Sequence, residues 1–319
     1  MNKKILLSLG LSALLASSVL AQEKITVFHA GSLAVPFLDI EKAFEAKYPQ
    51  YDVQREASGS RAAARKISEI GKAADVMASA DYQVINNLLI PNNAKFNAQF
   101  ATNEMAIAYT SKAKYANEIN AQNWTEIFLR DGVKIGHANP NMDPCGYRSI
   151  LVTKLAEEYY KTPGFFDKLL GYGDSYKVGE EDRKKVIVRP KETDLLGLME
   201  ANAYDYLYIY KSVAEQHGLN YITLPKQVSL KDNEFKDFYK TASFDISGKK
   251  PGQFITKKGG AMVYGITVAQ NKKSPANKEG AIKFVNFVLS DEGQAIMIKN
   301  GQGVISPANI TGDASIIGK

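Results

Sequence analysis

Two short turns of one kind, each placed between a β-rich run and an amphipathic stretch, constrain this chain more than any other feature. Residues 25–28 form a β-rich run that leads into the turn 29–32, and an extended run ending at Val53 leads towards the turn 57–60. Apolar side chains at helical spacing follow each turn, and a third strand is expected at residues 75–77. This alternation predicts an α/β fold with a parallel sheet covered by helices on both faces.

The middle of the chain repeats this arrangement. A strand is expected over residues 133–136, followed by a turn at 139–146 and a helix from Arg148 to Tyr160. Another strand, at residues 185–188, precedes a turn and a helix that starts near Glu192. Ligands of such sheets lie beyond the carboxyl ends of the strands, so these turns should converge on one site.

The length of 319 residues favours two domains. Two segments, Asn103–Thr110 and Met262–Val268, are candidates to cross between them. We therefore expect two doubly wound α/β domains joined by a two-strand hinge. Domain I is predicted to comprise residues 22–104 plus 266–319, and domain II residues 105–265. Hinged closure around a ligand is the usual behaviour of such a design.

The first residues have the character of an export signal. Lys3 and Lys4 form a positive segment, residues 5–15 are a short apolar run, and residues 19–21 form a small-residue cleavage site. We expect residues 1–21 to be a signal peptide that is removed before Gln22. Because no cysteine lies at the cleavage site, we expect a periplasmic protein that is not lipidated.

Charge and cysteine content narrow the class further. Loss of Lys3 and Lys4 reduces the formal charge from +6 to +4, and the remaining lysines are scattered rather than clustered. A nucleic-acid-binding surface needs a basic stripe with interleaved aromatic side chains, so no nucleic-acid partner is expected. Cys145 is the only cysteine, which excludes an intramolecular disulfide.

The turns that contain Gly31, Ser32 and Ser60 suit an oxyanion. A helix N-terminus offers unpaired backbone N–H groups and the positive end of the helix dipole. A serine hydroxyl at the same turn adds one more donor. The alternative is that Ser32 and Ser60 merely cap their helices, as serine often does. Because the turn occurs in two successive β-α units, both interpretations stay open.

The segment Pro144-Cys145 has two interpretations as well. Its small residues indicate a tight helix entry that offers the Cys145 backbone N–H to a ligand. A catalytic thiol would instead need His29, His137 or His217 in contact with Cys145, which the sequence cannot show. We expect the helix entry, and therefore no enzymatic activity.

Asp143 and Glu192 are an unusual pair, because each precedes or opens a helix on the side that should face the ligand. One explanation is that they only complement the helix dipole. If both line an anion pocket, they should repel an ordinary tetrahedral anion by several kcal/mol at about 4 Å. Two carboxylates are favourable in such a pocket only if they bind the central atom of the oxyanion. Tungsten and molybdenum accept additional oxygen neighbours in this way, whereas sulfur and phosphorus do not readily do so.

Tyr206, Tyr208 and Tyr210 share one face of their predicted strand, because alternate residues do so. Such a stripe is usually core packing. Tyr210, at the carboxyl end of the strand, is best placed to reach a ligand with its hydroxyl.

Seven stretches of the chain resemble one known family, the periplasmic molybdate- and tungstate-binding proteins, and in particular its tungstate-binding branch. They occur in order over nearly the whole mature chain. The stretches are VFHAGSL (27–33), ASGS (57–60), ADVMASAD (74–81), DPCGYRS (143–149), RPKETDL (189–195), YKSVAEQHG (210–218) and YGITV (264–268).

The resemblance implies a type II periplasmic-binding-protein fold with the oxyanion between the domains. It further implies that Ser32 and Ser60 donate from domain I, and that the Cys145 backbone and Tyr210 donate from domain II. Gly31 and Pro144 belong to the same turns and are expected to line the site.

The octahedral branch of this family has a metal-coordinating Asp before the Pro-Cys-Gly turn and a Glu at the later helix start. Asp143 and Glu192 match these positions, so the chain resembles the octahedral branch. The implied partner is the membrane permease of an ABC importer, the implied ligand is tungstate or molybdate, and no cofactor is expected. We expect a monomer. A sulfate, phosphate or ferric receptor stays open as an alternative, and the sequence does not rank tungstate against molybdate.

Overall fold

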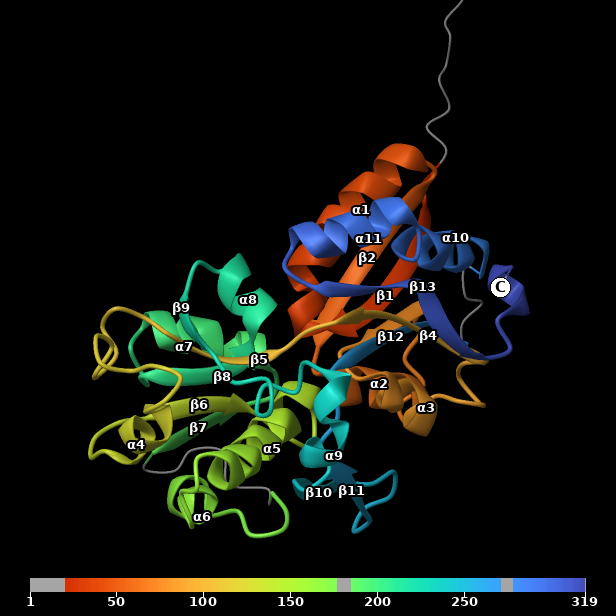
Figure 1. Cartoon of the computed structure of the whole chain (residues 1–319). Coiled ribbons are helices and arrows are strands. Elements are labelled where there is room, and N and C mark those ends of the chain that lie inside the picture. Colours follow the sequence, from red (N-terminus) through yellow and green to blue (C-terminus); the bar gives the residue numbers. More distant parts are fainter. Residues whose placement is uncertain (1–20, 177–184, 271–277, 319) are drawn as a thin grey trace, which may run out of the picture.

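Six strands form the sheet of the first lobe, which we call lobe I (Figure 1). The structure is a computed structural model and describes residues 21–176, 185–270 and 278–318. In the order β13-β4-β12-β3-β1-β2, the last three strands are parallel and the first three are antiparallel to their neighbours. The strands are β1 (Glu23–Ala30), β2 (Tyr51–Ser58), β3 (Val76–Ser79), β4 (Phe96–Thr102), β12 (Val263–Val268) and β13 (Gly303–Gly312).

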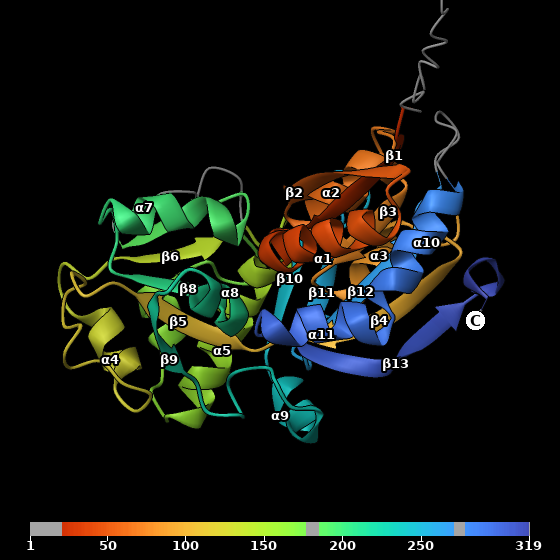
Figure 2. The same cartoon turned by 90° about the horizontal axis from the view of Figure 1, so that it is seen from above.

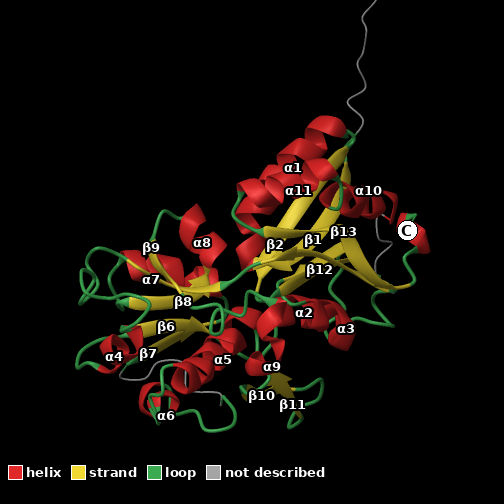
Figure 3. Cartoon of the chain, in the orientation of Figure 1, coloured by secondary structure: helices red, strands yellow, loops and turns green. Residues whose placement is uncertain are grey.

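Alternation of side chains along β1 explains why helices cover both faces of this sheet. Val27 belongs to an apolar cluster with Phe37 and Phe284, whereas the next residue, Phe28, belongs to a second cluster with Ile67 and Ile85. Figure 3 shows the helices of lobe I on both sides of its strands. They are α1 (Ala34–Lys47), α10 (Lys278–Val288) and α11 (Asp291–Lys299) on one face, and α2 (Ser60–Ser68) and α3 (Tyr82–Leu88) on the other.

Five strands form the sheet of lobe II, in the order β7-β6-β8-β5-β9. Trp124 lies edge-on to Phe128, Phe165 and Tyr208 and is fully buried, so aromatic packing fixes one face of this lobe. The strands are β5 (Met105–Tyr109), β6 (Ile135–Ala138), β7 (Val186–Arg189), β8 (Tyr206–Tyr210) and β9 (Asn220–Thr223). The helices are α4 (Trp124–Leu129), α5 (Pro144–Tyr159), α6 (Phe165–Leu169), α7 (Leu196–Glu200) and α8 (Lys211–Gln216).

Two crossings connect the lobes, which lie side by side in Figure 2. The chain leaves lobe I between β4 and β5, through Asn103 and Glu104, and returns to it just before β12. Before the return it forms a short helix and a hairpin that packs on α5. The short helix is α9 (Lys236–Tyr239), and the hairpin consists of β10 (Ser243–Ser247) and β11 (Phe254–Lys258). Short 3-10 helices elsewhere in the two lobes and in this segment are η1 (Gly31–Leu33), η2 (Glu192–Leu195), η3 (Asn233–Phe235) and η4 (Ser315–Ile317).

The two-lobed α/β architecture confirms the predicted fold class, with three differences in detail. The sheet of lobe I is mixed, since β4, β12 and β13 run antiparallel to their neighbours. The helix expected from Arg148 begins at Pro144, because the Asp143 side chain caps it and proline suits the first helical position. The predicted boundary between residues 265 and 266 falls inside β12, which belongs entirely to lobe I.

None of the helices in the described ranges has the length and apolar character needed to cross a membrane. Residues 1–20 of the predicted signal peptide lie outside the part of the chain that the structure describes.

His29 on β1 and His137 on β6 are both buried, and burial lowers the pKa of each imidazole to about 4. An unfolded histidine titrates near about 6.5, so the stabilising effect of the neutral imidazole is complete above that pH and is lost as the pH falls towards 4. Between pH 7 and pH 5, each histidine should lower the free energy of unfolding by about 2 kcal/mol. Urea unfolding at both pH values measures this change in the free energy of unfolding. The change between pH 7 and pH 5 should be about 2 kcal/mol smaller in His137→Gln than in the wild-type protein. Equal pH dependence in the two proteins would contradict this assignment.

Candidate functional site

The strand register brings the turns of each lobe together. Ala30 at the end of β1 pairs with Ser58 at the end of β2, so the turns that follow them are neighbours at one edge of the sheet. In lobe II, Ala138 at the end of β6 pairs with Arg189 at the end of β7. The segments that carry Asp143 and Glu192 therefore also leave adjacent parallel strands at the same edge.

The two pairs of turns meet face to face between the lobes, and glycines make the approach possible. A Cβ atom at Gly31 would lie 2.9 Å from Oε1 of Glu192. A Cβ atom at Gly59 would lie 2.5 Å from the carbonyl oxygen of Met142 and 3.1 Å from Cβ of Asp143. Each glycine of lobe I thus packs directly against one of the two predicted carboxylate positions of lobe II.

Backbone hydrogen bonds also cross between the lobes at this point. The Met142 carbonyl accepts from the N–H groups of Arg61 (3.1 Å) and Ala62 (3.2 Å) in the first turn of α2. These two amides are therefore occupied in this closed arrangement. The helix N-terminus that we predicted as an anion site at Ser60 here binds the carbonyl of the opposite lobe.

Ser32 and Ser60 do not cap their helices, which excludes the simpler of the two explanations for them. Residues Ala30 and Gly59 occupy the N-cap positions, and neither helix has a side-chain cap. The Ser32 hydroxyl lies 3.0 Å from the Tyr264 hydroxyl, and Ser60 Oγ accepts the Ala80 N–H at 3.0 Å. Both serines are buried. Their hydroxyl groups are therefore oriented by contacts within lobe I and keep hydrogen-bonding capacity towards the space between the lobes.

Asp143 has a structural role as well as its place in the site. Its Oδ1 accepts the Cys145 N–H at 2.7 Å and caps α5, as the dipole explanation predicted. The Cys145 amide that we expected to face an oxyanion is thus bound to Asp143 in this structure. The second oxygen, Oδ2, accepts a long hydrogen bond of 3.3 Å from the Glu192 N–H.

Helix capping does not explain Glu192. Lys191 is the N-cap of η2, and both carboxylate oxygens of Glu192 are buried without a hydrogen-bond partner among the described residues. Burial raises the pKa of Glu192 well above its usual range, and the neighbouring Asp143 carboxylate raises it further. Burial also raises the pKa of Asp143. A buried carboxylate pair of this kind is costly unless something in the pocket compensates its charge.

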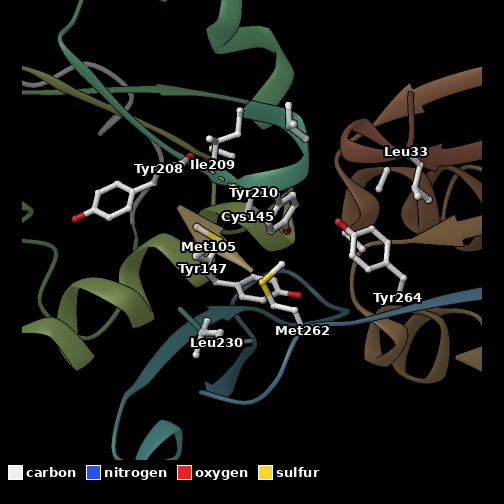
Figure 4. Close-up of a cluster of buried hydrophobic side chains, with 14 of the residues drawn as sticks. Leu33, Met105, Cys145, Tyr147, Tyr208, Ile209, Tyr210, Leu230, Met262 and Tyr264 are labelled. Atoms are coloured by element: carbon white, nitrogen blue, oxygen red, sulfur yellow. Dashed lines mark hydrogen bonds between the residues drawn. The ribbon is translucent and has the colours of Figure 1, made fainter. Parts of the chain in front are cut away.

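Tyr210 and Tyr264 line the site from opposite lobes, and Figure 4 shows Tyr210 with Cys145 on one side and Tyr264 with Leu33 on the other. The two tyrosine rings are 6.3 Å apart, edge to face. The Tyr210 hydroxyl accepts a hydrogen bond of 2.9 Å from Arg148. Tyr210, at the end of β8, is completely buried.

Arg148 and Tyr264 are also parts of this site, although the sequence did not predict them there. Arg148 is buried, and its guanidinium donates to the Tyr210 hydroxyl and to the Ala80 carbonyl, so a fixed positive charge lies beside the carboxylate pair. The Tyr264 hydroxyl contacts Ser32 and accepts from Asn103 at 3.1 Å. Both residues lie inside the matched stretches 143–149 and 264–268, but nothing in the local pattern distinguishes them from core residues.

Cys145 lacks the features of a nucleophile. Burial raises the pKa of its thiol well above the usual range, and Sγ lies 3.6 Å from the Tyr208 carbonyl. Nδ1 of His29 contacts the Ala30 carbonyl, and His137 contacts the Ala138 carbonyl through Nδ1 and the Tyr172 hydroxyl through Nε2. A protonated, buried thiol is inert towards substrates.

Two α/β lobes that enclose a polar site between the ends of their strands have the periplasmic-binding-protein fold, and the matching family model gives the class as extracellular solute-binding proteins. The chain belongs to the family of bacterial extracellular solute-binding proteins, whose model matches residues 25–302. Proteins of this family are transport components and not enzymes, in agreement with the prediction.

Proteins of similar sequence support the same family assignment. The chain is 52% identical over 284 residues to an uncharacterized solute-binding protein of Petrotoga mobilis, covering 89% of this chain and 84% of the relative. It is 45% identical over 301 residues to the molybdate/tungstate-binding protein WtpA of Pyrococcus abyssi, covering 89% and 85%. The predicted family is thereby confirmed.

Solved structures with low sequence identity share the fold. The periplasmic molybdate-binding protein of Azotobacter vinelandii superimposes with a TM-score of 0.62 at 14% identity, over 87% of this chain and 98% of that one. The sulfate-binding protein SubI of Mycobacterium tuberculosis gives a TM-score of 0.60 at 15% identity, over 92% and 89%.

The contact at Gly59 predicts the effect of a single methyl group. In Gly59→Ala, the new Cβ would overlap the Met142 carbonyl, which is backbone and cannot move aside, so the lobes should separate while each stays folded. Small-angle X-ray scattering should give a larger radius of gyration than for the wild-type protein. Gly197→Ala is the matched control, because a Cβ at Gly197 meets nothing within 4 Å. Equal radii for both variants would contradict the proposed contact.

Proposed function

We propose that this protein captures tungstate or molybdate between its two lobes and delivers it to the membrane permease of an ABC importer. The observation that carries the proposal is the Glu192 carboxylate, which is buried beside Asp143 with no hydrogen-bond partner among the described residues. Support also comes from the relatives in Pyrococcus abyssi and Thermococcus kodakarensis that are named molybdate/tungstate-binding proteins, at 45% and 42% identity.

The carboxylate pair favours one class of oxyanion. Sulfate or phosphate would share this buried site with two acidic groups whose pKa values are already raised, and each carboxylate that is ionised would repel the anion by several kcal/mol at about 4 Å. Tungsten or molybdenum can instead accept the carboxylate oxygens as additional ligands, which turns the repulsion into a bond. We infer that Asp143 Oδ2 and the Glu192 carboxylate complete an octahedral coordination of the metal.

The remaining groups suit the oxygens of the same anion. Ser60 Oγ already accepts the Ala80 N–H, so its own hydrogen is available to a ligand. Of the contacting hydroxyls of Ser32 and Tyr264, one donates to the other, which leaves one hydrogen for the anion. We propose the same donor role for Tyr210, whose oxygen accepts from Arg148 and whose hydrogen is free to donate.

The turns at Gly31 and Pro144 complete the proposed site. Glycine at position 31 lets the Glu192 side chain approach, and Pro144 starts α5 directly after Asp143. Cys145 contributes through its backbone N–H, which holds Asp143 Oδ1 and so directs Oδ2 towards Glu192. A further metal or cofactor has no part in this proposal.

We also propose that the protein acts in the periplasm as a monomer. The match to a family of extracellular solute-binding proteins supports export, and the Lys3, Lys4 and apolar segment of residues 5–15 supply the sequence signal for it.

Isothermal titration calorimetry of residues 22–319 tests the proposal. Tungstate and molybdate should bind tightly with one site per chain, and sulfate should not bind. In the variant Asp143→Asn with Glu192→Gln, tungstate affinity should fall by about 100-fold or more, or about 3 kcal/mol, because charged ligands to the metal are lost. Asn retains the helix cap of α5, so the fold should persist.

The control for this experiment is Glu200→Gln, at an exposed position of α7, which should bind as the wild-type protein does. Unchanged or tighter tungstate binding in the double variant would indicate a plain anion site. Failure of the wild-type protein to bind either oxyanion, or tight binding of sulfate, would overturn the proposal.

A further inference from the structure

A second buried charge cluster joins the lobes outside the oxyanion site. Asp81, in the turn between β3 and α3 of lobe I, accepts from the Lys257 ammonium of β11 at 2.7 Å and from the Tyr147 hydroxyl of α5 at 2.5 Å. The side chains of Asp81 and Lys257 are only 7% and 11% exposed. Lys257 also donates to Gln83 at 2.7 Å, so one cation contacts two side chains of the opposite lobe.

The burial of this ion pair depends on closure of the lobes. Asp81 caps α3 through the Gln83 N–H, a contact that stays within lobe I, whereas the contacts to Tyr147 and Lys257 cross between the lobes. The positive charges of Lys257 and Arg148 hold the pKa of the Asp81 carboxyl well below its usual range, so it is ionised at neutral pH. Opening the lobes must separate the buried charges and hydrate them.

The cluster connects directly to residues of the oxyanion site. Tyr147 lies one helical turn after Asp143 on α5, so its bond to Asp81 fixes the end of the helix that carries Asp143. The turn of Asp81 also includes Ala80, whose N–H binds the Ser60 hydroxyl and whose carbonyl accepts from Arg148 at 2.8 Å. The contacts that close the lobes therefore also orient donors of both lobes.

We propose that Asp81, Tyr147 and Lys257 form an interlobe latch that sets how slowly the bound oxyanion is released. The proposal rests on the proposed function for the identity of the ligand. None of the three belongs to the residues proposed to contact the ligand. They act as positioning residues, because release requires the lobes to part and the ion pair to break first.

A cavity of about 860 Å³ borders the latch. Asp81, Tyr147 and Lys257 all line this cavity, together with Lys258 and Lys236. Water can therefore reach the ion pair as soon as the lobes begin to separate. The latch should accordingly control the rate of release and affect the rate of capture much less.

The test is a chase experiment in which protein loaded with radioactive molybdate is mixed with excess unlabelled tungstate. In Lys257→Gln, the buried Asp81 carboxylate has lost its ion-pair partner, which destabilises the closed form and not the open one. Release should therefore be at least about tenfold faster than from the wild-type protein. The association rate should change by less than about threefold. Tyr147→Phe removes the other donor and should accelerate release in the same direction.

Lys258→Gln is the matched control, because Lys258 is the next residue on β11, borders the same cavity and is exposed. It should release the ligand at the wild-type rate. Release from Lys257→Gln within twofold of the wild-type rate, or equal acceleration in Lys257→Gln and Lys258→Gln, would overturn the latch. A lower melting temperature with unchanged release would indicate a merely structural role and would overturn it too.

If the wild-type protein binds neither oxyanion, the proposed function fails and the latch is tested by small-angle scattering without ligand. Lys257→Gln should then have a larger radius of gyration than Lys258→Gln, because the closed form has lost its ion pair. Equal radii would overturn the latch independently of the ligand.

Discussion

The close contact between two glycines of lobe I and two carboxylate-bearing turns of lobe II is the constraint on which the rest of the structure depends. Gly31 packs against the Glu192 carboxylate, and Gly59 packs against Met142 and Asp143 with no room for a Cβ beside the Met142 carbonyl. Because these turns follow adjacent parallel strands in each lobe, the register of the sheets decides which side chains meet. Closure therefore buries two acidic groups together, and on the proposed function an oxyanion whose central metal accepts their oxygens as ligands stabilises the closed form.

Helix α5 connects the chemistry of the site to the movement of the lobes. At its start, the Cys145 N–H donates the capping hydrogen bond to Asp143. One turn later, Tyr147 contacts Asp81 and Arg148 contacts the Ala80 carbonyl, both in lobe I. A rigid helix transmits position along its axis, so the same element carries a proposed metal ligand and two interlobe contacts. On the proposed function, binding and closure are then one event, as in other hinged closures around ligands.

The sequence predicted the parts of this arrangement that local patterns encode. The β-α turns at Gly31 and Gly59 followed from the alternation of strand and helix, and the conspicuous Asp143 and Glu192 followed from their places at helix starts. The antiparallel strands β4 and β13 were not predicted, since β13 pairs with β4 across roughly two hundred residues and neither has a signal beyond a short apolar pattern.

The role of Arg148 was missed for a related reason. Its partners, the Ala80 carbonyl and the Tyr210 hydroxyl, are 68 and 62 residues away along the chain, so its burial is decided by tertiary structure alone. The bond between the Cys145 amide and Asp143 is the opposite case, because a capping interaction over two residues is visible in the sequence. From the sequence, helix capping and ligand binding were alternatives for Asp143, whereas in the structure its two carboxylate oxygens have separate contacts.

The central claim is that Asp143 and Glu192 bind the metal of the oxyanion directly. X-ray absorption at the tungsten L edge of the tungstate-loaded protein tests it most directly, because the spectrum reports how many oxygens surround the metal. Six oxygen neighbours, with two longer than the others and absent from the variant Asp143→Asn with Glu192→Gln, are the predicted result. Four equal oxygen neighbours in the wild-type protein, as in free tungstate, would contradict the claim.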